Sequence, residues 1–181
     1  LSMLCDSLDI NVWELIDLAN LHPRVNILQP GPGVGGHCIA VDPWFIVSKD
    51  PSQSHLIKTA RQVNDSKPLW VVNKVKEELK RLNSDNKLSI DKKLIVSCFG
   101  LSFKADVDDL RGSPSIEIVK HLAALDNLII KAVEPNIDGL PSDLRNIELS
   151  SVEDALASAD LVLLLVDHHQ FKKIKIPPSL P

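Results

Sequence analysis

The chain has 181 residues and a mass of 20.0 kDa, which is enough for one domain or two small ones. Hydrophobic residues make up 44% and charged residues 24% of it, which excludes a disordered tail, a collagen-like fibre and a low-complexity linker. Lys and Arg number 20 against 24 Asp and Glu, so the formal net charge is −4. Such a chain lacks the basic surface with which nucleic-acid-binding proteins hold phosphates.

Membrane insertion and a disulfide framework are not expected either. The longest purely aliphatic run, residues 161–166, is far shorter than the roughly 20 residues that span a bilayer. No charged-then-apolar signal segment is found near residue 1. The three cysteines, Cys5, Cys38 and Cys98, are odd in number and widely spaced, which favours a reducing compartment, with the cytoplasm as the default.

The first half of the chain reads as helices around one irregular segment. Residues 1–21 have helical spacing, with Asn11 as a cap, and residues 24–28 could be extended. A long helix is predicted over 54–82, where Pro68 should kink it or mark a second helix capped by Ser66. The polar stretch 83–91 is predicted to be a linker.

The second half alternates between strands and helices. Strands are predicted at 94–99, 128–133 and 161–166, and helices at 114–125, with Ser113 as the cap, and at 152–159. This order is typical of parallel strands joined by crossover helices. We therefore expect an α/β chain: a helical central region, 1–90, followed by a small Rossmann-like parallel-sheet domain, 91–181.

The segment 31–36, with the sequence GPGVGG, holds four of the seven glycines. It matches the pattern G-x-G-x-x-G, but a dinucleotide fingerprint also needs a strand before it and a helix opening on its last glycine. Here Pro32 lies inside the turn, and Asp42-Pro43 is expected to interrupt the next element of the chain. We therefore favour a loop whose backbone N–H groups approach a substrate.

Cys38 comes directly after this loop, and a helix that begins there would carry Asp42 on the same face. A thiol at a helix N-terminus is activated by the helix dipole, which makes Cys38 a candidate nucleophile, with a buried structural cysteine as the alternative. His37 is not expected to converge with its neighbour Cys38, and 168–169 are expected to be a solvated strand end. No metal site is predicted.

Two cations lie after the first predicted strand, at the sheet edge where open α/β proteins bind ligands. Lys104 and Arg111, together with the start of the helix after Ser113, are placed to meet phosphate. The alternative is that both are surface charges paired with the acidic residues of 106–109.

These segments resemble the UDP-glucose/GDP-mannose dehydrogenase family. Residues 24–27 and 33–43, the latter GVGGHCIAVDP, resemble its active-site segment. Residues 99–104, 108–111 and Ser113-Pro114 resemble the second sequence signature of this family. The resemblance covers nearly the whole chain. The amino-acid sequence of segments 29–32 and 42–45 is most similar to that of members that act on UDP-N-acetyl-D-mannosamine.

The resemblance implies an enzyme that uses NAD to oxidise the C6 alcohol of a UDP-sugar to a carboxylate. Cys38 would form a thiohemiacetal with the intermediate aldehyde and then a thioester, and Asp42 would help to activate water or stabilise the thiol. The sugar nucleotide would lie along Gly33, Val34, Gly35 and Gly36. Lys104 matches a substrate-binding lysine, and Arg24 resembles an arginine that reaches the substrate of the partner subunit.

The resemblance also implies a homodimer and parts that lie outside this sequence. The chain starts at Leu1, within a helical pattern, and we expect the NAD-binding domain and an oxyanion-stabilising lysine and asparagine before it, and a late strand after Pro181. The fragment alone is therefore predicted to be inactive. The alternatives are a fragment specific for another sugar nucleotide, such as UDP-glucose or UDP-N-acetylglucosamine, a non-catalytic UDP-sugar-binding module and a catalytically dead scaffold.

Overall fold

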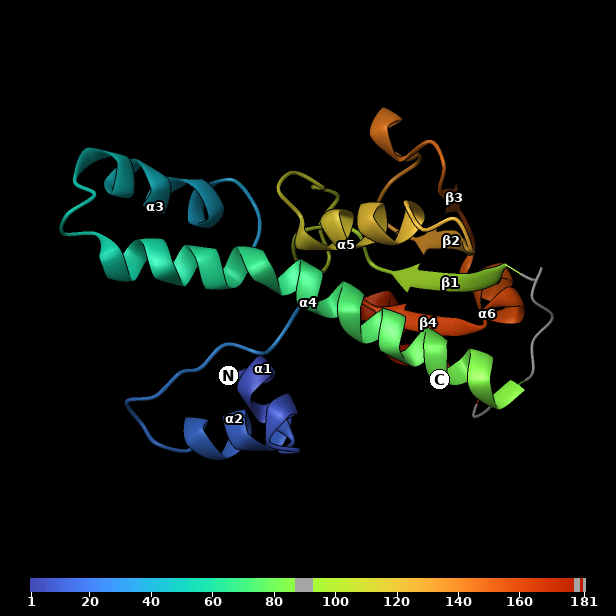
Figure 1. Ribbon diagram of the computed structural model, residues 1–181, viewed down its shortest axis with the longest axis horizontal. Coiled ribbons are helices and arrows are strands. Elements are labelled where there is room, and N and C mark those ends of the chain that lie inside the picture. The colour runs from blue at the N-terminus through green and yellow to red at the C-terminus, as the bar shows by residue number, and fades with distance from the viewer. Residues whose placement is uncertain (87–92, 178–179, 181) are drawn as a thin grey trace. The chain divides into compact units, whose positions relative to one another are not determined.

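A computed structural model describes residues 1–86, 93–177 and 180 (Figure 1). The chain divides into two units, residues 1–31 and residues 32–181. In the described residues, no helix is both long enough and apolar enough to cross a membrane.

The first unit contains two short helices, α1 (Ser2–Ser7) and α2 (Val12–Asn20). The side chain of Asn11 caps α2 by accepting hydrogen bonds from the backbone N–H groups of residues 13 and 14, as predicted. Residues 24–28 come next as irregular backbone, not as a strand. They are held by the Asn20 side chain, which bonds both the N–H and the carbonyl of Ile27, at 2.7 and 2.9 Å.

The second unit opens with two helices that continue through their prolines. α3 (Cys38–Lys49) contains Pro43 and α4 (His55–Asn86) contains Pro68. The interruption expected at Asp42-Pro43 was therefore wrong, and of the two alternatives for Pro68 the second helix was wrong. A proline removes one helical hydrogen bond, and the neighbouring turns and the packing of α4 against α3 and α5 can offset that loss. Residues 83–86 of the predicted linker belong to α4, and 87–91 lie outside the described residues.

The sheet has the expected parallel topology, with the strand order β3-β2-β1-β4. Strands β1 (Leu94–Phe99) and β2 (Leu128–Val133) have the predicted bounds, β4 (Leu161–Leu164) is shorter, and β3 (Glu148–Leu149) was not predicted. Phe99 pairs with both Val133 and Leu164, so three strands end at one edge. The loops after these strands therefore meet there.

Helices cover both faces of the sheet. α5 (Pro114–Ala123), capped by Ser113 as predicted, and α4 bury the larger core with one face. α6 (Val152–Ser158) and a 3-10 turn, η2 (His169–Lys173), lie over a smaller cluster that contains Phe99 and Phe171. A second 3-10 turn, η1 (Ser142–Leu144), precedes β3. Side chains of β1 alternate between the two clusters because successive strand residues point to opposite faces.

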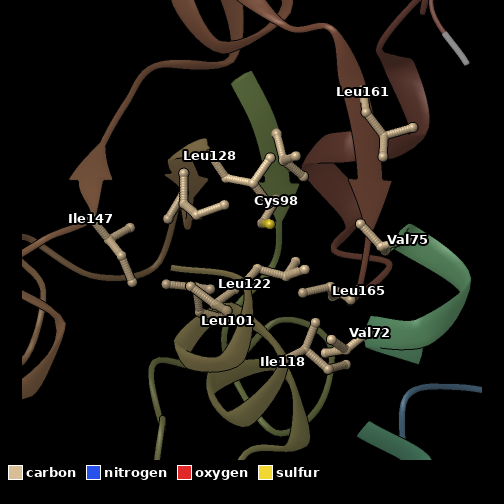
Figure 2. Close-up of a cluster of buried hydrophobic side chains, with 14 of the residues drawn as sticks. Val72, Val75, Cys98, Leu101, Ile118, Leu122, Leu128, Ile147, Leu161 and Leu165 are labelled. Atoms are coloured by element: carbon tan, nitrogen blue, oxygen red, sulfur yellow. The ribbon is translucent and has the colours of Figure 1, made fainter. Parts of the chain in front are cut away.

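Two of the three cysteines belong to the interior. Cys98 is fully buried among Leu101, Leu122 and Leu128 (Figure 2), and burial raises the pKa of its thiol to about 12. Cys5 is buried within the first unit. Cys38 alone is exposed, so it is the thiol available for chemistry.

Candidate active site

The glycine loop packs against the segment that leads into α5. A Cβ on Gly35 would lie 2.3 Å from the carbonyl oxygen of Gly112 and 2.5 Å from a ring carbon of Pro114. The N–H of Gly36 donates to the same Gly112 carbonyl, at 3.3 Å. The loop therefore needs a glycine at position 35 because its backbone lies directly on the backbone of another segment.

Asn64 of α4 holds the other side of the glycine loop. Its side-chain oxygen accepts from the N–H of Val34 at 2.7 Å, and its amide donates to the carbonyl of Val34 at 3.0 Å. The two bonds mimic a pair of strand hydrogen bonds and fix the loop to the long helix. Asn64 could not be singled out from the sequence, since nothing in the pattern of a helix separates a functional asparagine from a solvated one.

The loop does not fit the NAD fingerprint. The segment before it is irregular rather than a strand, and the helix begins at Cys38, two residues beyond the last glycine. The space beside Gly33, Gly35 and Gly36 is filled by Gly112, Pro114 and Phe103 of the same chain, where a fingerprint leaves room for a pyrophosphate.

Cys38 is the first residue of α3 and is exposed, which places its thiol at the positive end of the helix. Asp42 lies four residues later in the same helix and is also exposed. The helix considered as a possibility from the sequence therefore exists, and the spacing puts the thiol and the carboxylate on one side of it.

His37 converges on Cys38, contrary to the expectation that adjacent side chains would diverge. The Nδ1 of His37 lies 3.4 Å from the Sγ of Cys38, and its Nε2 lies 3.6 Å from an oxygen of Asp109. The ring also meets the edge of Phe103, with centroids 6.2 Å apart. Residues far apart in the chain thus orient this imidazole, which the sequence could not reveal.

Asp109 is held as a carboxylate by Arg111. The guanidinium donates to both carboxylate oxygens, at 2.9 and 2.7 Å, and lowers the pKa of Asp109 well below its usual range. The pairing raises the pKa of Arg111 in turn. This bears out the alternative that Arg111 pairs with a nearby acid, although its side chain is still 74% exposed.

Lys104 lies on a loop that is anchored at the carboxyl edge of the sheet. The loop begins after β1, and its N–H groups at Leu101 and Ser102 donate to one oxygen of Glu134, at 2.7 and 3.1 Å. The Ser102 hydroxyl donates to the carbonyl of Lys104 at 2.7 Å. Lys104 itself is exposed, and its Nζ lies 5.5 Å from the ring of Phe103.

His168 is buried, so the expectation of a solvated strand end was wrong for this residue, although His169 is exposed. Its Nδ1 accepts from the N–H of Asp106 at 2.9 Å, which leaves the proton on Nε2, 3.0 Å from Glu134. The ring thereby connects the far end of the Lys104 loop to the carboxylate that holds its near end. Glu134 and His168 lie at or shortly after strand ends, a position that could have drawn attention to them.

Phe103 joins the two halves of the site. It belongs to the Lys104 loop, its ring packs on His37, and a Cβ on Gly36 would lie 3.0 Å from it. The loop that carries the thiol and the loop that carries the lysine are therefore in contact. Arg24 belongs to the first unit, where it is exposed.

A cleft of about 470 Å³ borders the glycine loop. Its lining includes Val34, Arg111 and the start of α5, all of which were candidate substrate contacts from the sequence. Arg61 of α4 also lines it and is paired with Asp65 at 2.6 Å. The size of the cleft is within the range of small-ligand sites.

Comparison with known proteins decides the family. Residues 1–66 match the UDP-glucose/GDP-mannose dehydrogenase family, central domain, and residues 97–179 match the UDP binding domain of the same family. The chain belongs to the UDP-glucose/GDP-mannose dehydrogenase family. The resemblance and the α/β fold expected from the sequence are thereby confirmed.

Individual members of this family are similar over almost all of the chain. It is 55% identical to an NDP-N-acetyl-D-galactosaminuronic acid dehydrogenase of Ralstonia nicotianae and 54% identical to the UDP-N-acetyl-D-mannosamine dehydrogenase of Escherichia coli K12, over 96% of its length in both cases. It spans only 39% and 41% of those two proteins.

A solved structure shares the fold. The UDP-N-acetyl-mannosamine dehydrogenase of Staphylococcus aureus superimposes with a TM-score of 0.74 at 42% identity, covering 96% of this chain and 38% of that one. The homologous proteins are dehydrogenases, and this chain corresponds to less than half of each of the three.

Proposed function

We propose that this chain is the thiol-bearing and UDP-binding part of an NAD-dependent UDP-N-acetyl-D-mannosamine 6-dehydrogenase. The observation that carries the proposal is the position of Cys38: it is exposed at the start of α3, within the segment that matches the family's central domain, while Cys5 and Cys98 are buried. The whole protein would oxidise a C6 alcohol to a carboxylate. NAD would accept the hydrides, and its binding site would not be the glycine loop.

Cys38 is the proposed nucleophile. Its sulfur adds to the C6 aldehyde to give a thiohemiacetal, oxidation of that adduct gives a thioester, and hydrolysis releases the carboxylate and regenerates the thiol. A thiol suits this sequence because thiolate is both a strong nucleophile and a good leaving group. Asp42, one turn along the exposed side of α3, is the proposed aid to water activation.

The sheet domain is the proposed holder of the diphosphate. Lys104 is exposed at the carboxyl edge of the parallel sheet, where ligands of such folds bind, and the same loop leads into the N-terminus of α5. Arg111 and the backbone of 33–36 are further proposed contacts. The proposed partition is a central region, 1–90, and a UDP-sugar-binding domain, 91–181.

Calorimetric titration of the chain with UDP, and separately with NAD⁺, tests this assignment. We expect UDP to bind and NAD⁺ not to bind. Lys104→Gln should weaken UDP binding about 10- to 100-fold because a hydrogen bond to a charged group contributes roughly 1.5–3 kcal/mol. Lys80→Gln, which removes an exposed lysine near the end of α4, is the matched control and should leave binding unchanged. Equal affinity in the two variants would contradict the role of Lys104.

A homodimer is part of the proposal. Large apolar side chains of α3 and α4 are exposed, among them Phe45 at 67% and Leu56 at 83%. Burying such side chains against a second copy is favourable because it removes apolar area from water. Sedimentation should show a species near twice 20.0 kDa, and a Phe45→Asp variant should shift it to the monomer.

A second substrate has support of its own. The Ralstonia relative, named for N-acetyl-D-galactosaminuronic acid, is 55% identical, about as similar as the Escherichia coli relative. Both names contain an N-acetylated sugar, so the alternative differs in sugar configuration rather than in chemistry. Turnover by the whole protein with UDP-N-acetyl-D-mannosamine and with UDP-N-acetyl-D-galactosamine, compared by kcat/KM, separates the two.

A further inference from the structure

His37 contacts both Cys38 and Asp109, and this arrangement goes beyond the proposed role of the thiol. We propose that His37 is the base that takes the proton of the Cys38 thiol, and that Asp109, fixed by Arg111, positions and stabilises the imidazole. The inference rests on Cys38 being the nucleophile, as proposed above, but its test needs neither a sugar nucleotide nor NAD.

The contacts define the tautomer of His37. Its Nε2 faces the Asp109 carboxylate at 3.6 Å, and an unprotonated nitrogen there would set a lone pair against a negative charge. The proton of the neutral ring therefore lies on Nε2. Nδ1 is left as an acceptor, 3.4 Å from the Cys38 sulfur, which is within the range of a hydrogen bond to sulfur. A neutral imidazole in this state is ready to receive the thiol proton.

The rest of the site keeps the ring in this orientation. Arg111 binds both oxygens of Asp109, so the carboxylate cannot rotate freely away from the ring. The N–H of Phe103 donates to the backbone carbonyl of Asp109 at 3.1 Å, and the Phe103 ring packs on the imidazole. Neighbouring side chains in a helical turn are separated by roughly 100° around the axis, so this convergence depends on the contacts that hold the ring.

The step balances without an external oxidant or reductant. The thiol proton moves from Sγ to Nδ1 of His37, and the electron pair of the S–H bond stays on sulfur as a thiolate. That pair forms the bond to the aldehyde carbon, while the electron pair of the carbonyl bond moves to oxygen. The oxygen then takes the proton from Nδ1, which gives the thiohemiacetal hydroxyl and restores the neutral imidazole.

The charge changes favour this route. When His37 is protonated, the imidazolium lies between the Cys38 thiolate and the Asp109 carboxylate, and opposite charges then surround it on two sides. Asp109 is ionised throughout because Arg111 lowers its pKa. Asp109 contacts no reacting atom and acts through the ring, which makes it a positioning residue.

The rate of alkylation of Cys38 by iodoacetamide tests the proposal on the chain itself. The modified cysteine is identified by mass spectrometry, with buried Cys5 and Cys98 as internal controls. At roughly pH 6.5, where a free thiol is almost entirely protonated, His37→Ala should react at least about tenfold more slowly than the natural sequence. Above about pH 9.5 the rates should converge because the solvent then deprotonates the thiol in every variant. Asp109→Asn should show a smaller loss with the same dependence on pH.

Two controls separate this role from a structural one. His121→Ala removes an exposed histidine from α5 and should leave the rate unchanged. Added imidazole should restore part of the rate in His37→Ala, which a merely misfolded loop would not allow. Equal rates at pH 6.5, or a ratio that stays the same at every pH, would overturn the proposal. Retained turnover of the whole protein as Cys38→Ala would instead refute the proposed nucleophile, and with it the catalytic role of the relay, whatever the alkylation rates show.

Discussion

Replacing Gly35 by alanine should separate the glycine loop from the segment on which it packs. The added Cβ would lie 2.3 Å from the carbonyl oxygen of Gly112 and 2.5 Å from a ring carbon of Pro114. Both neighbours are parts of the main chain or of a rigid ring, so neither can rotate away. The two segments must move apart by about 0.7 Å before the closest contact reaches 3.0 Å.

That movement has two costs. Overpacking of a closely packed contact destabilises proteins by roughly 1–3 kcal/mol. The hydrogen bond from the N–H of Gly36 to the Gly112 carbonyl is already 3.3 Å long and would be lost, at a further cost of about 1 kcal/mol. We therefore expect Gly35→Ala to lower the free energy of unfolding by about 2–4 kcal/mol and the Tm by roughly 5–15 °C. The φ angle of Gly35 is not in the left-handed region, so the penalty is steric.

Denaturant unfolding followed by circular dichroism measures this effect, with Gly139→Ala as the matched control. A Cβ on Gly139 meets nothing within 4 Å, and this substitution should change the stability by less than about 0.5 kcal/mol. The reasoning is refuted if the two variants unfold at the same denaturant concentration. Such a result would mean that the loop and the Gly112 segment are not interlocked.

Three further predictions concern buried and paired groups. Glu134→Gln should lower the free energy of unfolding by about 1–3 kcal/mol, because an amide N–H₂ group would then face backbone donors. It should also speed hydrogen exchange of the backbone amides in the Lys104 loop. Unchanged exchange would contradict this prediction. Cys98 should stay unmodified by iodoacetamide in the folded protein and react after unfolding, since burial raises its pKa to about 12; mass spectrometry checks it. The folded-state pKa of Asp109 is lowered, so its pair with Arg111 stabilises the fold above about pH 4, and this contribution is lost as the pH falls through the folded-state pKa. The difference in stability between the natural sequence and Asp109→Asn should therefore shrink below that pH, and a constant difference would argue against the pair.

The sequence determined the main strands of the sheet domain and the helices between them. The runs 94–99 and 128–133 are mostly apolar because most of their side chains are covered by helices or neighbouring strands, and the strands have those bounds. Helix capping by Asn11 and Ser113 could also be predicted from the sequence, since a cap is a contact between near neighbours in the chain. The position of Cys38 at the start of a helix could be considered from the sequence because the glycines before it do not form a regular element.

Only the tertiary structure decided which side chains meet at the thiol. His37 was expected to diverge from Cys38, and it converges because Asp109 and Phe103, brought there by the sheet domain, hold its ring. His168 was expected to be solvated, and it is buried because Glu134 and Asp106 supply partners for both of its nitrogens. The local sequence pattern determines the helices and strands through backbone and burial preferences. Contacts between distant residues depend on how these helices and strands pack, and a single sequence does not show that packing.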